Sequence, residues 1–221
     1  MRAFVVGNGP SLKVEQLNKL IPEVSFGVNR IRLIYNQTRW RPTHWVMMDF
    51  SNSLFYKEDI HLHSRQGYPC HIRSDIMAKF LEWCVRDKNW PTLENMNIVE
   101  RCSHIDIERH TADAWHEPVC QMGGSVPTAI QLAVQMGYSP IYTIGMDGNK
   151  KGNAENNFIA GYIDRDAVDV HKAMVANEST KLALSIAKRE CSGRGVQLID
   201  ATIGGSSYKS LPEVDFYDLF D

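Results

Sequence analysis

Short apolar runs alternate with amphipathic segments along most of the chain. Seven apolar runs predict β-strands, at residues 3–6, 24–28, 44–48, 68–73, 97–102, 140–145 and 196–199. Apolar positions at helical spacing predict helices over residues 11–19, 75–86, 126–136 and 168–190. Strands that alternate with helices are typical of a mainly parallel sheet covered by helices on both faces. The pattern therefore predicts one α/β, Rossmann-like domain over residues 1–221.

Two segments interrupt this pattern. Residues 103–122 carry several histidines and few apolar runs, so we expect an irregular peripheral segment there. Residues 149–170 are polar and contain Gly and Asn in their first half, and we expect them to form a lid. No repeat or linker divides the chain.

Charge and cysteine content narrow the class of protein. The formal net charge is -2 and no long stretch is basic, which argues against a nucleic-acid partner. No apolar run approaches the ~20 residues of a membrane span, and the N-terminal run is too short for a signal peptide. The five cysteines are odd in number and contain no C-x-x-C pair. Free thiols in a cytoplasmic protein without structural zinc are therefore expected.

Polar residues follow the first three predicted strands. The first strand runs into Gly-Asn-Gly-Pro-Ser at residues 7–11, the second ends at Asn29, and the third ends at Asp49. Parallel sheets place their ligand crevice at these carboxyl ends. Gly7 and Gly9 permit a sharp turn close to a ligand, and Ser11 is expected to cap a helix whose N-terminus faces a phosphate. A purely structural turn is the alternative.

Three further positions carry candidate chemistry. Gly124 and Ser125 precede a helix and suit a carboxylate or phosphate, although Ser125 could equally be an N-cap alone. Asp147 follows the strongest strand and could hold a ribose hydroxyl, a metal ion or its own turn. His171, near the start of the last helix, could act as a general acid or base or lie on the surface.

The order of these motifs resembles a known superfamily. The matching pieces are Phe-Val-Val-Gly-Asn-Gly-Pro-Ser-Leu from Phe4, Gly-Val-Asn-Arg ending at Arg30, Gly-Ser125, Met-Gly-Tyr-Ser-Pro-Ile-Tyr-Thr-Ile-Gly-Met-Asp ending at Asp147, and Asp-Ala-Thr-Ile-Gly-Gly ending at Gly205. Together they resemble the bacterial sialyltransferases of glycosyltransferase family 42 and the 6-hydroxymethylpterin diphosphokinase MptE-like proteins. They cover about half of the chain.

The resemblance implies roles for individual residues. Asn8 and Gly9 would contact the phosphate and sugar of a CMP-linked donor, and Asn29 would line the same site. A serine at the position of Ser125 holds the donor's carboxylate in the sialyltransferases, and a histidine matching His171 by position is their general base.

Three positions bear on how far the resemblance extends. Asp49 stands where the sialyltransferases have an asparagine, and Asn149 stands where they have the first of two tyrosines that stabilise the departing phosphate. Tyr162 lies in the corresponding segment and is expected to take that part.

The sequence thus predicts a transferase that binds a nucleotide-activated substrate. The first hypothesis is a metal-independent glycosyltransferase with a CMP-linked, sialic-acid-like donor and a glycan or small-molecule acceptor. It needs no cofactor, and a homo-oligomer is compatible with it. The alternative is a pterin-type diphosphokinase with ATP and Mg²⁺, which requires Asp49 and Asp147 to meet at one metal. A non-catalytic nucleotide-binding protein is the third hypothesis.

Overall fold

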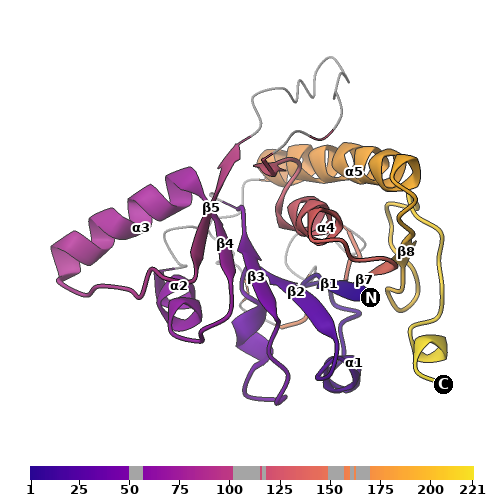
Figure 1. Ribbon diagram of the computed structural model, residues 1–221, viewed down its shortest axis with the longest axis horizontal. Helices are drawn as coiled ribbons and strands as arrows, with labels where there is room; N and C mark the ends of the chain where they lie inside the picture. Colours follow the sequence, from indigo (N-terminus) through magenta and orange to yellow (C-terminus); the bar gives the residue numbers. More distant parts are fainter. Residues whose placement is uncertain (50–56, 102–114, 116–117, 149–156, 160–161, 163–169) are drawn as a thin grey trace.

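The fold is α/β, with an all-parallel sheet flanked by helices (Figure 1), as the sequence predicts. The computed structural model describes residues 1–49, 57–101, 115, 118–148, 157–159, 162 and 170–221, with the backbone alone at 101, 120 and 170–177. None of the helices within these residues is both long and apolar enough to cross a bilayer.

Eight strands of the described residues form the sheet. They are β1 (Ala3–Val6), β2 (Val24–Val28), β3 (His44–Met47), β4 (Cys70–Arg73), β5 (Met96–Arg101), β6 (Cys120–Gln121), β7 (Ile141–Ile144) and β8 (Leu198–Asp200). Their order is β6-β5-β4-β3-β2-β1-β7-β8, and every neighbouring pair is parallel. Strands β2 to β6 follow one another on one side of β1, and β7 and β8 lie on its other side. The strand order therefore reverses between β1 and β7, where open α/β sheets bind ligands.

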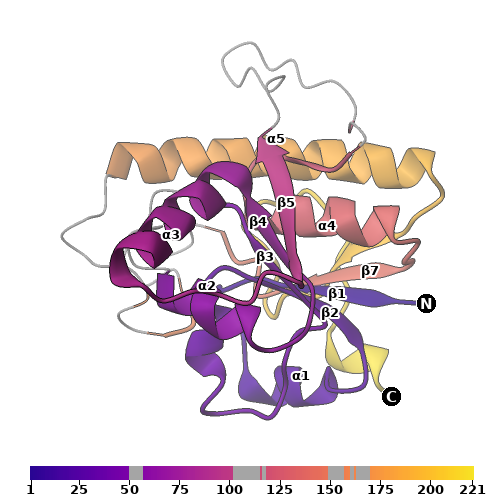
Figure 2. The same cartoon turned by 60° about the vertical axis from the view of Figure 1, so that its left-hand side comes forward.

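Helices cover both faces of the sheet. They are α1 (Val14–Lys19), α2 (Lys57–Ser64), α3 (Ser74–Asp87), α4 (Ser125–Gln135) and α5 (Val170–Gly193), with 3₁₀ turns η1 (Ile31–Ile34) and η4 (Tyr217–Leu219). Figure 1 shows α4 and α5 on one side of the strands and α1 on the other, and Figure 2 shows α5 running alongside α4. The carboxyl edge of the strands remains between these layers.

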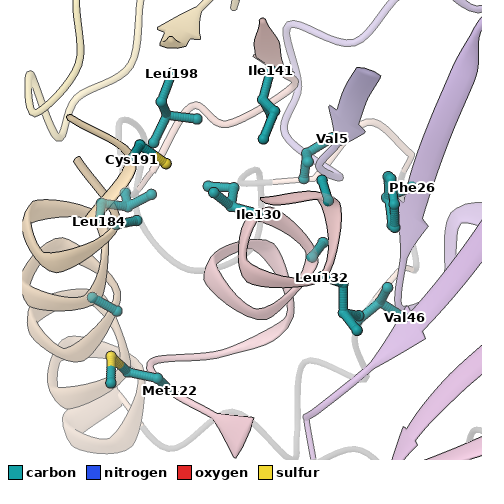
Figure 3. Close-up of a cluster of buried hydrophobic side chains, with 14 of the residues drawn as sticks. Val5, Phe26, Val46, Met122, Ile130, Leu132, Ile141, Leu184, Cys191 and Leu198 are labelled. Atoms are coloured by element: carbon teal, nitrogen blue, oxygen red, sulfur yellow. The ribbon is translucent and has the colours of Figure 1, made fainter. Parts of the chain in front are cut away.

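Alternation along the strands divides the core in two. Val5 on β1 packs toward α4 and α5 with Ile130 and Leu184 (Figure 3), whereas Phe4 and its cluster lie on the face that α1, α2 and α3 cover. Because side chains alternate across a strand, the apolar runs of the central strands supply both clusters. This explains why these strands carry apolar residues on both faces of the sheet.

Some element boundaries differ from the sequence prediction. The first helix begins at Val14 rather than at Ser11, because residues 9–12 form a turn in which Leu12 N donates to Gly9 O at 3.1 Å. The short helices η1 and α2 and the strand β6 were not predicted. Helix α2 combines a weakly apolar sequence with fully buried Asp59 and His63, so its pattern is not amphipathic.

The turns after β1 and β7 interlock through glycines. Gly7 N donates to Ile144 O and Gly9 N donates to Gly145 O, each at 2.8 Å. A Cβ atom at Gly7 would lie 2.5 Å from Gly145 O, and one at Gly9 would lie 2.0 Å from Asp147 Oδ2. Gly145 itself adopts a φ of 62°. Only glycine fits these positions without moving backbone.

We expect Gly7→Ala to destabilise the fold by about 1–3 kcal/mol, because the new methyl group would overlap a backbone carbonyl that cannot rotate away. Urea denaturation measures this loss. Gly193→Ala is the matched control, since no atom lies within 4 Å of the Cβ position there and that variant should stay within about 0.5 kcal/mol of the parent. Equal stability of the two variants would contradict the interlocked turns.

A pair of histidines lies in the central sheet. His44 Nδ1 and His71 Nε2 are 3.3 Å apart, and the His44 ring stacks on Phe26. Burial, with a smaller contribution from the neighbouring His44, lowers the pKa of His71 to about 4. Both rings are therefore neutral at pH 7, and one ring donates its N–H to the unprotonated nitrogen of the other.

The stability of the protein should fall as pH drops from 7 to 4.5. The unfolded chain protonates His71 near pH 6.5 while the folded chain resists until about pH 4, so acid favours unfolding through this window by about 2–3 kcal/mol. Urea denaturation at both pH values should show that His71→Gln, which keeps a polar side chain without titrating, loses less stability than the parent. An undiminished loss in that variant would refute the assignment.

Candidate functional site

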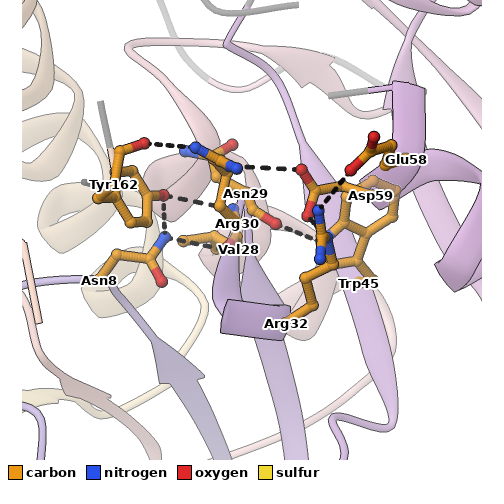
Figure 4. Close-up of polar contacts among 9 residues, drawn as sticks. All are labelled: Asn8, Val28, Asn29, Arg30, Arg32, Trp45, Glu58, Asp59 and Tyr162. Carbon is orange, nitrogen blue, oxygen red and sulfur yellow. Dashed lines mark hydrogen bonds and ion pairs between the residues drawn. The ribbon is translucent and has the colours of Figure 1, made fainter. Parts of the chain in front are cut away.

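The carboxyl ends of β1, β2 and β7 meet around Asn8. The Asn8 Nδ2 atom donates to Val28 O and to Tyr162 Oη, both at 2.8 Å, and Asn8 O accepts from Phe158 N at 2.9 Å (Figure 4). Because Val28 O can only accept, the amide nitrogen must face it, which fixes the orientation of the Asn8 side chain. Both amide hydrogens are thereby used, and the buried Oδ1 atom has no hydrogen-bond partner among the described residues. This turn therefore ties the 157–162 segment to the edge of the sheet.

Tyr162 is buried beside this turn. Its Oη atom accepts from Asn8 Nδ2 and, at 3.3 Å, from Arg30 N, so both of its lone pairs are occupied. Burial raises the pKa of Tyr162 against the opposing hydrogen bond from Arg30, and the charge of Asp49 raises it further. The hydroxyl is therefore neutral at pH 7 and keeps a proton that it can donate.

Asn29 and Ser125 connect the next two strands to α4. Ser125 Oγ donates to Asn29 Oδ1 at 2.6 Å and accepts from Met48 N at 3.0 Å. Asn29 has a φ of 48° and receives Trp45 Nε1 on its carbonyl at 2.7 Å. Ser125 is 5% exposed, so its hydroxyl bridges the ends of β2 and β3 rather than facing bulk water.

The start of α4 lies at this bridge. Gly124 is the N-cap residue, with a φ of 107°, and no side chain caps the helix. The alternative that Ser125 is only an N-cap is therefore wrong, because its hydroxyl is directed to Asn29 and Met48. The uncapped first turn of α4 has the polarity that favours an anion.

The two candidate carboxylates occupy different sides of the crevice. Asp147 Oδ2 accepts from Ser11 Oγ at 2.6 Å and from Ser11 N at 3.2 Å, and Asp147 is 4% exposed. Ser11 thus closes a turn onto Asp147 and does not cap a helix. Asp49 follows β3, and β2 and β1 separate that strand from β7, so the strand axes are roughly 14 Å apart. Among the described residues, no cluster of three or more His, Cys, Asp or Glu could hold a metal ion.

A buried ion cluster adjoins Tyr162 and was not predicted. Asp59, fully buried on α2, pairs with Arg30 Nε at 3.4 Å and with Arg32 Nε (Figure 4). Burial raises the pKa of Asp59, while both arginines oppose the rise. The only sequence signal was the pair Arg30 and Arg32 shortly after Asn29, because α2 itself has no clear helical pattern.

Two predicted residues cannot be placed at the site. Asn149 lies outside the described residues. His171 is in the first turn of α5, close to its predicted position near the helix start, but its side chain lies outside the described part of the chain.

No family model matches the chain, and no curated protein or solved structure shows significant similarity to it.

Ser125→Ala should lower the free energy of unfolding by about 1–3 kcal/mol, since Asn29 Oδ1 and Met48 N would each lose a partner in a buried place. Chemical denaturation measures the change. Ser185→Ala is the control, because that hydroxyl bonds to Lys181 O on an exposed helix face and its loss should cost little. If the two variants unfold alike, the bridge contributes nothing measurable.

Proposed function

We propose that this chain is a transferase that binds a nucleotide-activated substrate at the carboxyl edge of β1, β2 and β7. Within that class, we propose a metal-independent glycosyltransferase with a CMP-linked, sialic-acid-like donor. The observation that carries the proposal is the convergence of Asn8, Tyr162, Asn29 and Ser125 at the point where the strand order reverses. These are the positions to which the resemblance assigns donor binding.

The chemistry of the groups supports transfer without a metal. Departure of a phosphate requires neutral or positive donors that stabilise its developing charge. Tyr162 has a hydroxyl proton to donate, Arg30 lies beside it, and the uncapped start of α4 adds a favourable dipole. In this proposal the Ser125 hydroxyl exchanges its hydrogen bond to Asn29 Oδ1 for one to the carboxylate of the donor sugar. His171 removes the proton of the acceptor hydroxyl.

The placement of the carboxylates supports the transferase over the diphosphokinase. A Mg²⁺ site for ATP would need carboxylates close enough to share one ion. Asp147 is engaged by Ser11 after β7, whereas Asp49 follows β3 on the other side of two intervening strands. This pair is a poor basis for a single metal site.

Cytidine nucleotides should raise the melting temperature with or without Mg²⁺. A ligand at ~100 times its dissociation constant adds ~2.7 kcal/mol of stability, which thermal unfolding detects readily. We expect Asn8→Ala to reduce the shift strongly, because this change removes the amide that holds Tyr162 at the site. Asn36→Ala, at an exposed position, is the matched control and should keep the full shift.

Other outcomes of this experiment would favour one of the alternative functions. A shift with ATP and Mg²⁺ alone would favour the diphosphokinase, and no shift with CMP, CDP, UDP, GDP or ATP would refute nucleotide binding. For catalysis, His171→Ala should abolish release of CMP from a CMP-linked sugar while CMP still binds. Binding by the parent chain without any turnover would indicate a non-catalytic nucleotide-binding protein.

A further inference from the structure

Arg30 contacts Tyr162 at both of its ends. The backbone N–H of Arg30 donates to Tyr162 Oη at 3.3 Å, and the guanidinium Nη1 atom donates to the Tyr162 carbonyl oxygen at 2.6 Å. The guanidinium carbon also lies 5.8 Å from the centre of the Tyr162 ring. The backbone, ring and hydroxyl of Tyr162 are thus all in contact with one residue at the end of β2.

The guanidinium of Arg30 also has an acidic partner, on the side away from Tyr162. Asp59 on α2 is fully buried and pairs with Arg30 Nε on one oxygen and with Arg32 Nε on the other. An arginine presents its donors in a planar, rigid fork, so holding Nε fixes the direction of the remaining nitrogens. In Figure 4 the chain of contacts runs from Asp59 through Arg30 to Tyr162.

We propose that Arg30 is a positioning residue, which Asp59 orients and which holds the Tyr162 hydroxyl where it binds the phosphate of the nucleotide substrate. This inference rests on the proposed function. It assigns a role to Arg30, for which the resemblance implies none, and to Asp59, which lies outside the matching pieces. It also connects α2, on the opposite face of the sheet from α4 and α5, to the phosphate end of the site.

A positioning role for Arg30 predicts a selective loss of phosphate binding, which a general effect on folding does not predict. Without the guanidinium, the Tyr162 carbonyl loses its charged donor and the phenol is held by Asn8 and one backbone N–H. Binding of a phosphate should weaken, because the hydroxyl donor is no longer held in place before binding. Binding of the nucleoside portion, which Tyr162 does not contact in this proposal, should change little.

Calorimetric titration of CMP and of cytidine into the intact chain tests the role of Arg30. We expect Arg30→Met to weaken CMP binding about tenfold, within the range of coupling between contacting residues, and cytidine binding less than about twofold. Arg30→Lys should lie between Met and the parent, because lysine keeps the charge but lacks the fork. In a Tyr162→Phe background, Arg30→Met should have no further effect on CMP.

Arg41→Met is the matched control. Arg41 also donates to backbone carbonyls, those of Thr38 and Trp40, and its guanidinium carbon lies 4.1 Å from the centre of the Tyr35 ring. However, Arg41 precedes β3 and so lies near the amino-terminal ends of the strands, away from Arg30. Its substitution should leave both affinities unchanged. Equal weakening of CMP and cytidine by Arg30→Met, or an undiminished effect in the Tyr162→Phe background, would overturn the positioning role.

A measurement without ligand separates this inference from the proposed function. With 3-fluorotyrosine at position 162, the ¹⁹F signal of the parent should be protected from a soluble paramagnetic quencher, since Tyr162 is 6% exposed. Arg30→Met and Asp59→Asn should increase quenching, and Arg41→Met should not. Unchanged protection in both Arg30→Met and Asp59→Asn would overturn the inference. Increased quenching in these two variants, together with a parent chain that binds no nucleotide, would support the contact while refuting the proposed function.

Discussion

The close approach of the β1 and β7 turns is the constraint on which the site depends. Two hydrogen bonds of 2.8 Å join these turns, and glycine at positions 7, 9 and 145 makes the approach possible. The approach brings Asp147 onto Ser11 and sets the direction in which the chain leaves β1. Asn8 lies between two of the glycines, so its amide is directed toward β2 and Tyr162 by backbone geometry. The polar site is therefore a consequence of backbone packing.

Much of the fold could be predicted because its signal is local. The central strands are short runs rich in apolar residues, and α3 and α4 carry clear helical spacing, so their boundaries agree with the structure within about two residues. The predicted start of α1 was wrong, because a serine after Gly-Pro has the same local sequence whether it caps a helix or bonds to a distant carboxylate. Asp147 is 136 residues away, and only the fold brings it to Ser11.

The candidate site was predictable in its residues but not in its contacts. Asn8, Asn29 and Ser125 were chosen because each follows a strand or precedes a helix, and parallel topology brings such positions to one edge. The pairing of Ser125 with Asn29 spans 96 residues and leaves no periodic trace. Asp59 escaped prediction for a related reason: a buried carboxylate on a short helix resembles an ordinary surface residue until its two arginine partners are known.

A buried carboxylate between two arginines lies beside the carboxyl ends of the strands. Asp59 carries one negative charge between two guanidiniums, and burying such a group is tolerable only when it is paired. Replacing the cluster by apolar residues would satisfy the packing of α2 equally well, so stability alone does not account for it. In the role proposed for Arg30, Asp59 fixes a fork of donors at the end of β2 that holds Tyr162 in one place.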